Sequence, residues 1–129
     1  MREIVGERLQ AVNSVVEGYL DALYHRDAST MAEVFHRDAL MSTVRNGVLV
    51  ADTWSSWLAR LKDPTIQSPS SKKQIREEYI ERIEFVGSDL ATVNVRVAID
   101  PHTFNDILLL ACISGRWWIV SKVFTGWAD

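Results

Sequence analysis

Apolar side chains recur every three or four residues at the start of the chain, and this spacing predicts an amphipathic helix over residues 2–25. Asp27 follows the break after this helix, and as a typical N-cap residue it predicts a short second helix. A third helix is expected after Asp52, which we again expect to be the N-cap. Its apolar positions repeat at the helical spacing: Trp54, Trp57, Leu58 and Leu61.

The rest of the chain shows the patterns of strands and tight turns. Residues 39–45 are expected to be extended, Val48–Val50 to be a return strand, and Asn46-Gly47 to join them, because both turn positions accept a positive φ. Further strands are predicted over residues 74–86, 90–100, 104–113 and 116–125. Helices followed by an antiparallel meander predict an α+β fold, with three N-terminal helices packed on one face of a strongly curved mixed or antiparallel sheet.

The last two predicted strands are apolar on both faces. If Ser114-Gly115 is a two-residue turn, the register places Asp106, Leu108 and Val123 on one face and Lys122 on the other. Three helices can cover only one face, so we expect a partner subunit to cover the other in a homodimer; the alternative is a monomer with an exposed apolar sheet. The residues expected at this dimer face are Ile107, Leu109, Trp118, Val120 and Phe124.

The composition suits a single domain with one core, since 47% of the 129 residues are apolar. The net charge of −3 arises from charges of both signs spread along the chain, which argues against a nucleic-acid-binding surface. The single cysteine, Cys112, permits no internal disulfide, and no apolar run approaches the ~20 residues of a membrane span. We therefore expect a cytoplasmic protein without membrane contact. No residue spacing suggests a metal site, and no cofactor is expected.

Three motifs carry a resemblance to a known superfamily. They are Tyr19-Leu-Asp-Ala-Leu-Tyr-His-Arg-Asp27, Phe35-His-Arg-Asp38-Ala39, and Phe104-x-Asp106-x-Leu-x-Leu followed by Gly115-x-Trp117-x-Ile-Val-x-Lys122-Val-Phe124. With the predicted order of elements, they resemble the nuclear transport factor 2-like superfamily over nearly the whole chain. The last motif is similar to the branch named for lumazine binding. The resemblance implies a cone-shaped fold with a pocket between the sheet and the helices.

Within that superfamily, the first predicted helix is similar to the first helix of ketosteroid isomerase. The match places Tyr19 where the isomerase has its oxyanion tyrosine, and Asp106 about where it has a protonated aspartic acid. Counting on from Asp38-Ala39, the general base of the isomerase falls at Thr43, which cannot abstract a proton from carbon. The resemblance therefore implies that the hydrogen-bond donors of such a site are present and its base is missing.

Asp106 and Tyr19 are the main candidates for chemistry. A carboxyl group in an apolar pocket has its charged form destabilised, so a protonated Asp106 can donate a hydrogen bond to a ligand, whereas an ionised one can orient a base or a water. A buried phenol usually finds a partner, which for Tyr19 can be Asp106, a ligand or the backbone. Either residue can also be purely structural.

Other residues are expected to line the same pocket. Alternation along residues 74–86 turns Tyr79 and Glu81 inward, which makes Glu81 a candidate for the missing base, although a solvated strand end is the simpler explanation of Glu81. The remaining expected lining residues are Leu23, Met41, Thr43, Trp57, Tyr79, Val95 and Leu108.

Three classes of function fit these residues. The first is binding of a small, largely apolar molecule within the cone. The second is an enzyme of isomerase, cyclase or dehydratase type, with Asp106 and Tyr19 as donors to a developing enolate and Glu81 or a water as base. The third is a protein-interaction module, which a pocket filled by side chains would favour. The sequence leaves open whether residues 63–73 form a lid.

Overall fold

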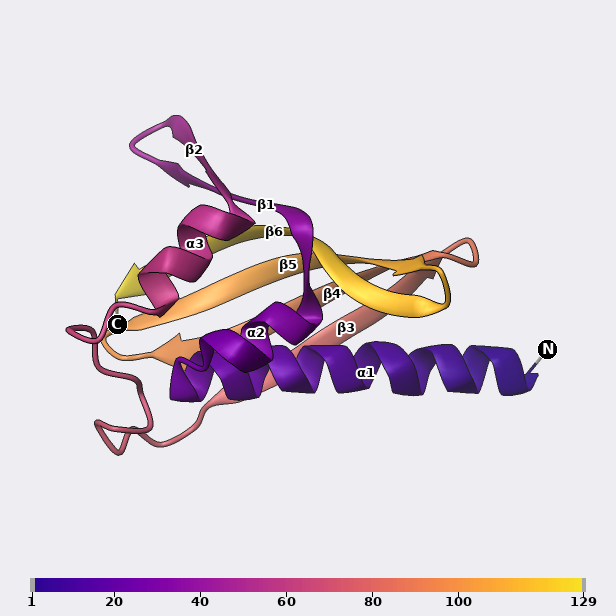
Figure 1. The fold of residues 1–129 in the computed structure, drawn as a ribbon, viewed down its shortest axis with the longest axis horizontal. Helices are drawn as coiled ribbons and strands as arrows, with labels where there is room; N and C mark the ends of the chain where they lie inside the picture. Colours follow the sequence, from indigo (N-terminus) through magenta and orange to yellow (C-terminus); the bar gives the residue numbers. More distant parts are fainter. Residues whose placement is uncertain (1, 129) are drawn as a thin grey trace.

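Three helices pack on one face of a curved, six-stranded mixed sheet (Figure 1). The computed structural model describes residues 2–128 and the side chains of residues 6–126. The helices are α1 (Arg2–His25), α2 (Ala28–Val34) and α3 (Trp54–Leu61). The strands are β1 (Phe35–Arg45), β2 (Val48–Thr53), β3 (Glu78–Val86), β4 (Leu90–Ile99), β5 (His102–Ile113) and β6 (Arg116–Ala128). The predicted α+β fold is confirmed.

The helix ends show how local sequence sets the boundaries. Asp27 caps α2 as predicted, because its side chain accepts a hydrogen bond from the Thr30 amide at 3.1 Å. The cap of α3 is Thr53, whose hydroxyl accepts from the Ser56 amide at 3.2 Å, and the prediction of Asp52 was wrong. Asp52 is still part of β2, and its carboxylate pairs with Arg60 at 2.5 Å instead.

The sheet order is β2-β1-β6-β5-β4-β3, with β1 and β6 parallel and every other pair antiparallel. In Figure 1, α1 runs along the length of the sheet, and the β1–β2 hairpin projects away from the body. The C-terminal ends of α1 and α3 and the loop of residues 62–77 gather at one end of the molecule. This end is the wide end of the cone. No helix in the described part of the chain is long and apolar enough to cross a membrane.

A bulge in β6 changes which side chains of the last strand face the helices. Ile119 pairs with Leu110 and Ser121 with Leu109, so Val120 is an extra residue without a partner in the ladder. After Val120, each side chain of β6 therefore lies on the face opposite to the one predicted from an uninterrupted register. Lys122 is therefore buried on the inner face, whereas Val123 is on the outer face and 44% exposed.

The same bulge corrects the expected dimer face. Phe124 pairs with Asp106 and points inward, so it is not available to a partner subunit on the outer face. Ile107 does face outward and is 53% exposed, as the sequence predicts. The other three expected residues, Leu109, Trp118 and Val120, are half-buried. The homodimer itself stays a prediction.

A second bulge, in β3, overturns the inward orientation expected of Tyr79 and Glu81. Ile80 pairs with Val95 and Arg82 with Asn94, which leaves Glu81 as the extra residue. Tyr79 consequently lies on the outer face and is 61% exposed. Glu81 is also exposed, and its carboxylate lies 3.5 Å from Nε of Arg96. Neither side chain lines the interior of the cone.

Candidate functional site

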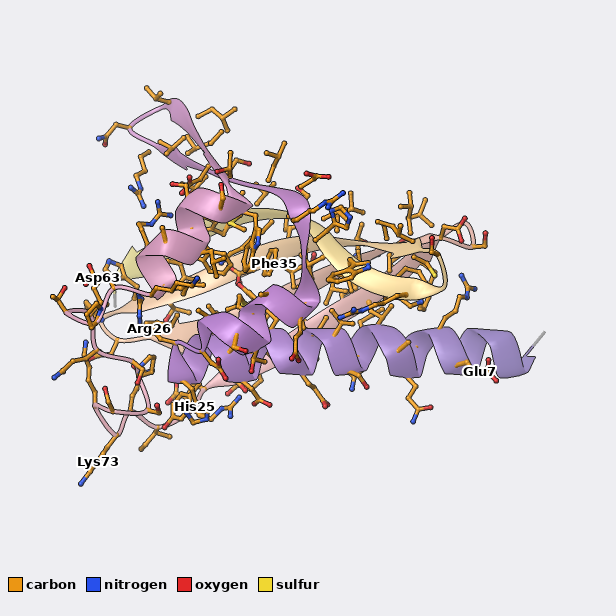
Figure 2. All side chains as sticks on the ribbon, in the orientation of Figure 1. Glu7, His25, Arg26, Phe35, Asp63 and Lys73 are labelled. Carbon is orange, nitrogen blue, oxygen red and sulfur yellow. The ribbon has the colours of Figure 1, made fainter. Side chains whose placement is uncertain are left out.

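Two adjoining cavities lie at the wide end of the cone, between the sheet, α3 and residues 62–77. Their volumes are about 340 and 330 Å³. We call the two together the cone cavity, because they share part of their walls. The residues that line both are Arg45, Trp57, Lys122 and Phe124. In Figure 2, Arg26 and Asp63 mark this end of the molecule, and Phe35 marks the interior between the helices and the sheet.

Asp106 and Tyr19 meet on the inner face of the sheet. The Tyr19 hydroxyl, from α1, donates a hydrogen bond of 2.5 Å to Oδ2 of Asp106, from β5. Both side chains are buried, and Asp106 lines the larger part of the cone cavity. Oδ1 of Asp106 is also buried and accepts no hydrogen bond from any residue that the structure describes. The pair thus offers a phenol held by a carboxyl group that has unused hydrogen-bonding capacity.

Burial governs the ionisation of Tyr19. The pKa of Tyr19 lies well above its usual value, first because the phenol is buried and second because the Asp106 charge and hydrogen bond oppose its ionisation. Tyr19 is therefore a neutral hydrogen-bond donor over the physiological pH range.

Lys122 is the third ionisable residue of the site, and its side chain is enclosed by aromatic rings. Its Nζ atom lies 4.7 Å from the ring centroid of Trp57, 4.9 Å from that of Phe124 and 5.2 Å from that of Tyr19. Only 8% of the residue is exposed, and within the described part of the chain its amine has no hydrogen bond or ion pair. Burial lowers the pKa of Lys122, and the nearby Asp106 charge partly opposes this change.

Further basic side chains surround the mouth of the cavity. Arg26, Arg45 and Lys72 line the larger part, and Arg60 lines the smaller part. Arg60 is paired with Asp52, and the Arg26 guanidinium donates to the Arg60 carbonyl oxygen at 2.6 Å. Basic groups thus outnumber acidic ones around the cavity although the whole chain has a net charge of −3. The local field favours an anionic or electron-rich group in the ligand.

The loop of residues 62–77 forms one wall of the larger part, through Ile66, Gln67, Pro69 and Lys72. It is joined to the end of α1 by two hydrogen bonds of Tyr24. The Tyr24 carbonyl oxygen accepts from the Ser70 amide at 2.9 Å, and its hydroxyl donates to the Gln74 carbonyl oxygen at 2.6 Å. These two hydrogen bonds hold the loop against the end of α1.

Four of the residues expected to line the pocket do so: Leu23, Met41, Thr43 and Trp57. The Thr43 hydroxyl is occupied, since it donates to the Phe124 carbonyl oxygen at 2.6 Å and so ties β1 to β6. Val95 and Leu108 point inward as expected but are fully buried in the closed core and line neither part of the cone cavity.

Tyr79 and Glu81 lie on the opposite face of the sheet because of the β3 bulge, so the structure leaves the proposed replacement base outside the cavity. Sequence reasoning missed Lys122, Phe124 and Arg45. Lys122 and Phe124 belong to the motif that carries the family resemblance, and their place in this motif could have indicated that they belong to the site. Among the described residues, no group of three His, Cys, Asp or Glu side chains is arranged to hold a metal ion.

Comparison with known proteins establishes the family. Residues 7–125 match the family described as "Putative lumazine-binding". The chain belongs to this family. No curated protein matches the chain. Family membership agrees with the cone-shaped architecture and leaves the chemistry of the cavity to be argued from its residues.

Solved structures of similar fold extend the family comparison. A nuclear transport factor 2-like protein of unknown function from Silicibacter pomeroyi is 23% identical with a TM-score of 0.79, over 95% of this chain and 98% of that one. A similar protein of unknown function from Shewanella baltica is 21% identical with a TM-score of 0.81, over 95% and 96%. A protein named as a putative scytalone dehydratase, from Novosphingobium aromaticivorans, is 14% identical with a TM-score of 0.70, over 100% and 92%. These likenesses establish the nuclear transport factor 2-like fold.

Proposed function

We propose that the protein binds a small, largely apolar molecule in the cone cavity, with a polar, electron-rich group of that molecule directed toward Lys122. The observation that carries the proposal is the cavity itself. Its two parts, of about 340 and 330 Å³, each fall within the volume range of small-molecule sites. Aromatic walls at Trp57 and Phe124 and a few converging polar groups are the usual composition of such sites.

The charge distribution supports the orientation of the ligand. An apolar body would pack against the half-buried Trp57 and Phe124 and the buried Leu23. A carboxylate, enolate or carbonyl oxygen would then meet Lys122 at depth or Arg45 nearer the mouth. Tyr19 and Asp106 lie beside Lys122 and form part of the surroundings of this group.

The names of similar proteins suggest compounds to test. The family description names lumazine as a ligand, and one protein of similar fold is named as a putative scytalone dehydratase. An enzyme of dehydratase or isomerase type is therefore the second candidate. The observation in its favour is that a phenol, a carboxyl group and an amine lie together in one cavity. Glu81 cannot be the base of such an enzyme, so Lys122 in its neutral form would take that part.

The experiment compares two ligands that differ only in charge. Naphthoate and naphthamide are titrated into isotopically labelled protein, together with lumazine, and binding is followed by NMR chemical shifts. We expect shifts at Trp57 and Phe124 with both naphthyl compounds, and tighter binding of the acid. Arg45→Gln should weaken naphthoate about three- to tenfold and leave naphthamide nearly unchanged.

Arg37→Gln is the matched control, because Arg37 is an exposed arginine outside the cavity. If no compound shifts the resonances of cavity residues, the proposal of a ligand-binding cone is wrong. If both variants weaken naphthoate equally, the cavity arginine is not the group that recognises the acid.

A further inference from the structure

We infer that Lys122 is a nucleophilic amine that captures small apolar aldehydes or ketones covalently as an imine. The inference rests on the proposed function, because the carbonyl compound must first enter the cone cavity. It goes further by naming the reactive atom, Nζ of Lys122, and the chemical class of the ligand.

The position of the amine is the first support. Lys122 lines both parts of the cone cavity, so a molecule in either part can reach its side chain. Three aromatic rings lie within 4.7–5.2 Å of Nζ, and within the described part of the chain Nζ has no hydrogen bond or ion pair. The amine is therefore next to the cavity and is not held by a direct contact with a carboxylate.

The chemistry of the surroundings is the second support. Only the neutral amine has the lone pair that attacks a carbonyl carbon, and desolvation in an apolar pocket is a known way to activate a lysine. Burial favours the neutral form of Lys122, while the Asp106 charge acts in the opposite direction. The free base can attack the carbonyl carbon, and the protonated imine that follows can be stabilised by the Asp106 charge.

The reaction balances without a co-reactant. The lone pair of Nζ forms a bond to the carbonyl carbon, the π electrons move to oxygen, and one proton passes from nitrogen to that oxygen to give a neutral carbinolamine. The carbinolamine then loses its hydroxyl group as water with the remaining proton of the nitrogen, and a carbon–nitrogen double bond remains. Asp106 lies near the amine, and its Oδ1, which accepts no hydrogen bond from any described residue, can accept one from the carbinolamine.

Reductive trapping tests the inference on the whole protein. Wild-type protein is incubated at pH 7 with 2-naphthaldehyde and sodium cyanoborohydride, which reduces the imine to a stable secondary amine. Peptide mapping then gives the rate of labelling at each lysine. We expect Lys122 to be labelled at least about ten times faster than the exposed Lys62 and Lys73, because an aldehyde bound in the cone cavity is held beside this amine at a high effective concentration.

A ligand without a carbonyl group distinguishes covalent capture by Lys122 from simple binding in the cone cavity. 2-Naphthylmethanol has the same apolar body and cannot form an imine, so its binding, measured by thermal shift, reports on the cavity alone. It should also compete with the labelling of Lys122 and leave Lys62 and Lys73 unaffected. Binding of the alcohol without preferential labelling of Lys122 would overturn the covalent inference and leave the proposed function standing. Failure of both compounds to bind would overturn both.

Lys122→Met and Lys62→Met form the variant pair. Lys122→Met should abolish the preferentially labelled site while the alcohol still binds, whereas Lys62→Met, on the exposed surface, should leave the labelling of Lys122 unchanged. If Lys122→Met does not fold, competition by the alcohol on the wild type still decides the question. Equal labelling rates at Lys122 and Lys73 in the wild type would contradict the inference.

Discussion

The hydroxyl of Tyr19 donates to Oδ2 of Asp106 at 2.5 Å, which joins the long helix to the sheet across 87 positions of sequence. Both groups are buried. If either were removed, the other would remain buried without this hydrogen bond, which destabilises the fold. The nearby Lys122 shares this environment, and its ionisation depends on the Asp106 charge. Stability, pH dependence and ligand binding are therefore expected to be coupled through these three side chains.

Tyr19→Phe should destabilise the fold by about 1–3 kcal/mol at pH 7, because the buried Asp106 Oδ2 loses its donor. The variant should also change how the free energy of unfolding depends on pH in alkaline solution. The folded protein raises the pKa of Tyr19, so above about pH 10 the unfolded chain releases this proton while the folded chain retains it, and the stability of the wild type falls as pH rises. Urea unfolding between pH 9 and 11 should show a smaller loss for Tyr19→Phe than for the wild type. Tyr79→Phe, at an exposed tyrosine, is the control and should keep the wild-type loss.

Lys122→Met should flatten the pH dependence of stability between neutral pH and about pH 10. The folded pKa of Lys122 is lowered below the value of about 10.4 expected when the chain is unfolded. Between these two values the unfolded chain binds more protons, so the free energy of unfolding of the wild type rises with pH. Below the folded pKa the cost of burying the charge is fully present. An equally steep rise in the methionine variant, measured by urea unfolding, would show that other groups cause it.

Asp106→Asn should preserve the fold but destabilise it by about 1–3 kcal/mol at pH 7, because the buried Lys122 charge loses a compensating carboxylate. The loss should shrink near pH 10, where the amine is neutral. Combining Asp106→Asn with Lys122→Met should remove most of it, and a double-mutant cycle should give a coupling of about 0.5–3 kcal/mol. Circular dichroism and urea unfolding of the four proteins provide the measurement, and additive effects would mean that the two side chains act independently.

Ile107→Glu tests the predicted homodimer. Ile107 and Val123 are exposed apolar side chains on the outer face of β5 and β6, and they line a groove of about 490 Å³ there. If a second copy covers this face, a buried glutamate should prevent association, and light scattering should show half the wild-type mass. Leu9→Glu, at an exposed position on α1, should leave the mass unchanged. A wild type that already has the mass of one chain would contradict the prediction.

The elements of this fold follow closely from local sequence. The helical spacing of apolar residues correctly predicts the helix over residues 2–25. The turn residues Asn46-Gly47 and Ser114-Gly115 have the positive φ angles that such turns need. These features depend on neighbours in sequence, so a single chain reveals them. The inward placement of Asp106 follows for the same reason, since Ser114-Gly115 fixes the register and β5 has no bulge.

The site was harder to predict because two bulges intervene. The alternation of polar and apolar residues cannot reveal the extra residue at Val120, because the odd and the even positions of β6 both contain apolar side chains. It cannot reveal the extra residue at Glu81 either, because the odd and the even positions of β3 both mix polar and apolar residues. Each bulge places two side chains on the face opposite to the predicted one: Lys122 and Phe124 inward, Tyr79 and Glu81 outward. Bulges depend on contacts with distant strands, which a pattern of single residues does not record.

The bulge at Val120 means that the character of the cavity depends on the length of β6 as well as on its composition. If all residues of β6 were kept and the bulge were absent, the register set by Ser114-Gly115 would pair Ser121 with Leu108 and turn Lys122 toward solvent. The cavity would then lose its amine. Deleting Val120 would instead remove the extra residue and keep Ser121 opposite Leu109 and Lys122 opposite Leu108, so the amine would still face the cavity. For this family, the number of residues between the turn glycine and the lysine, considered together with the bulge, is thus as informative about ligand chemistry as a substitution of the lysine itself.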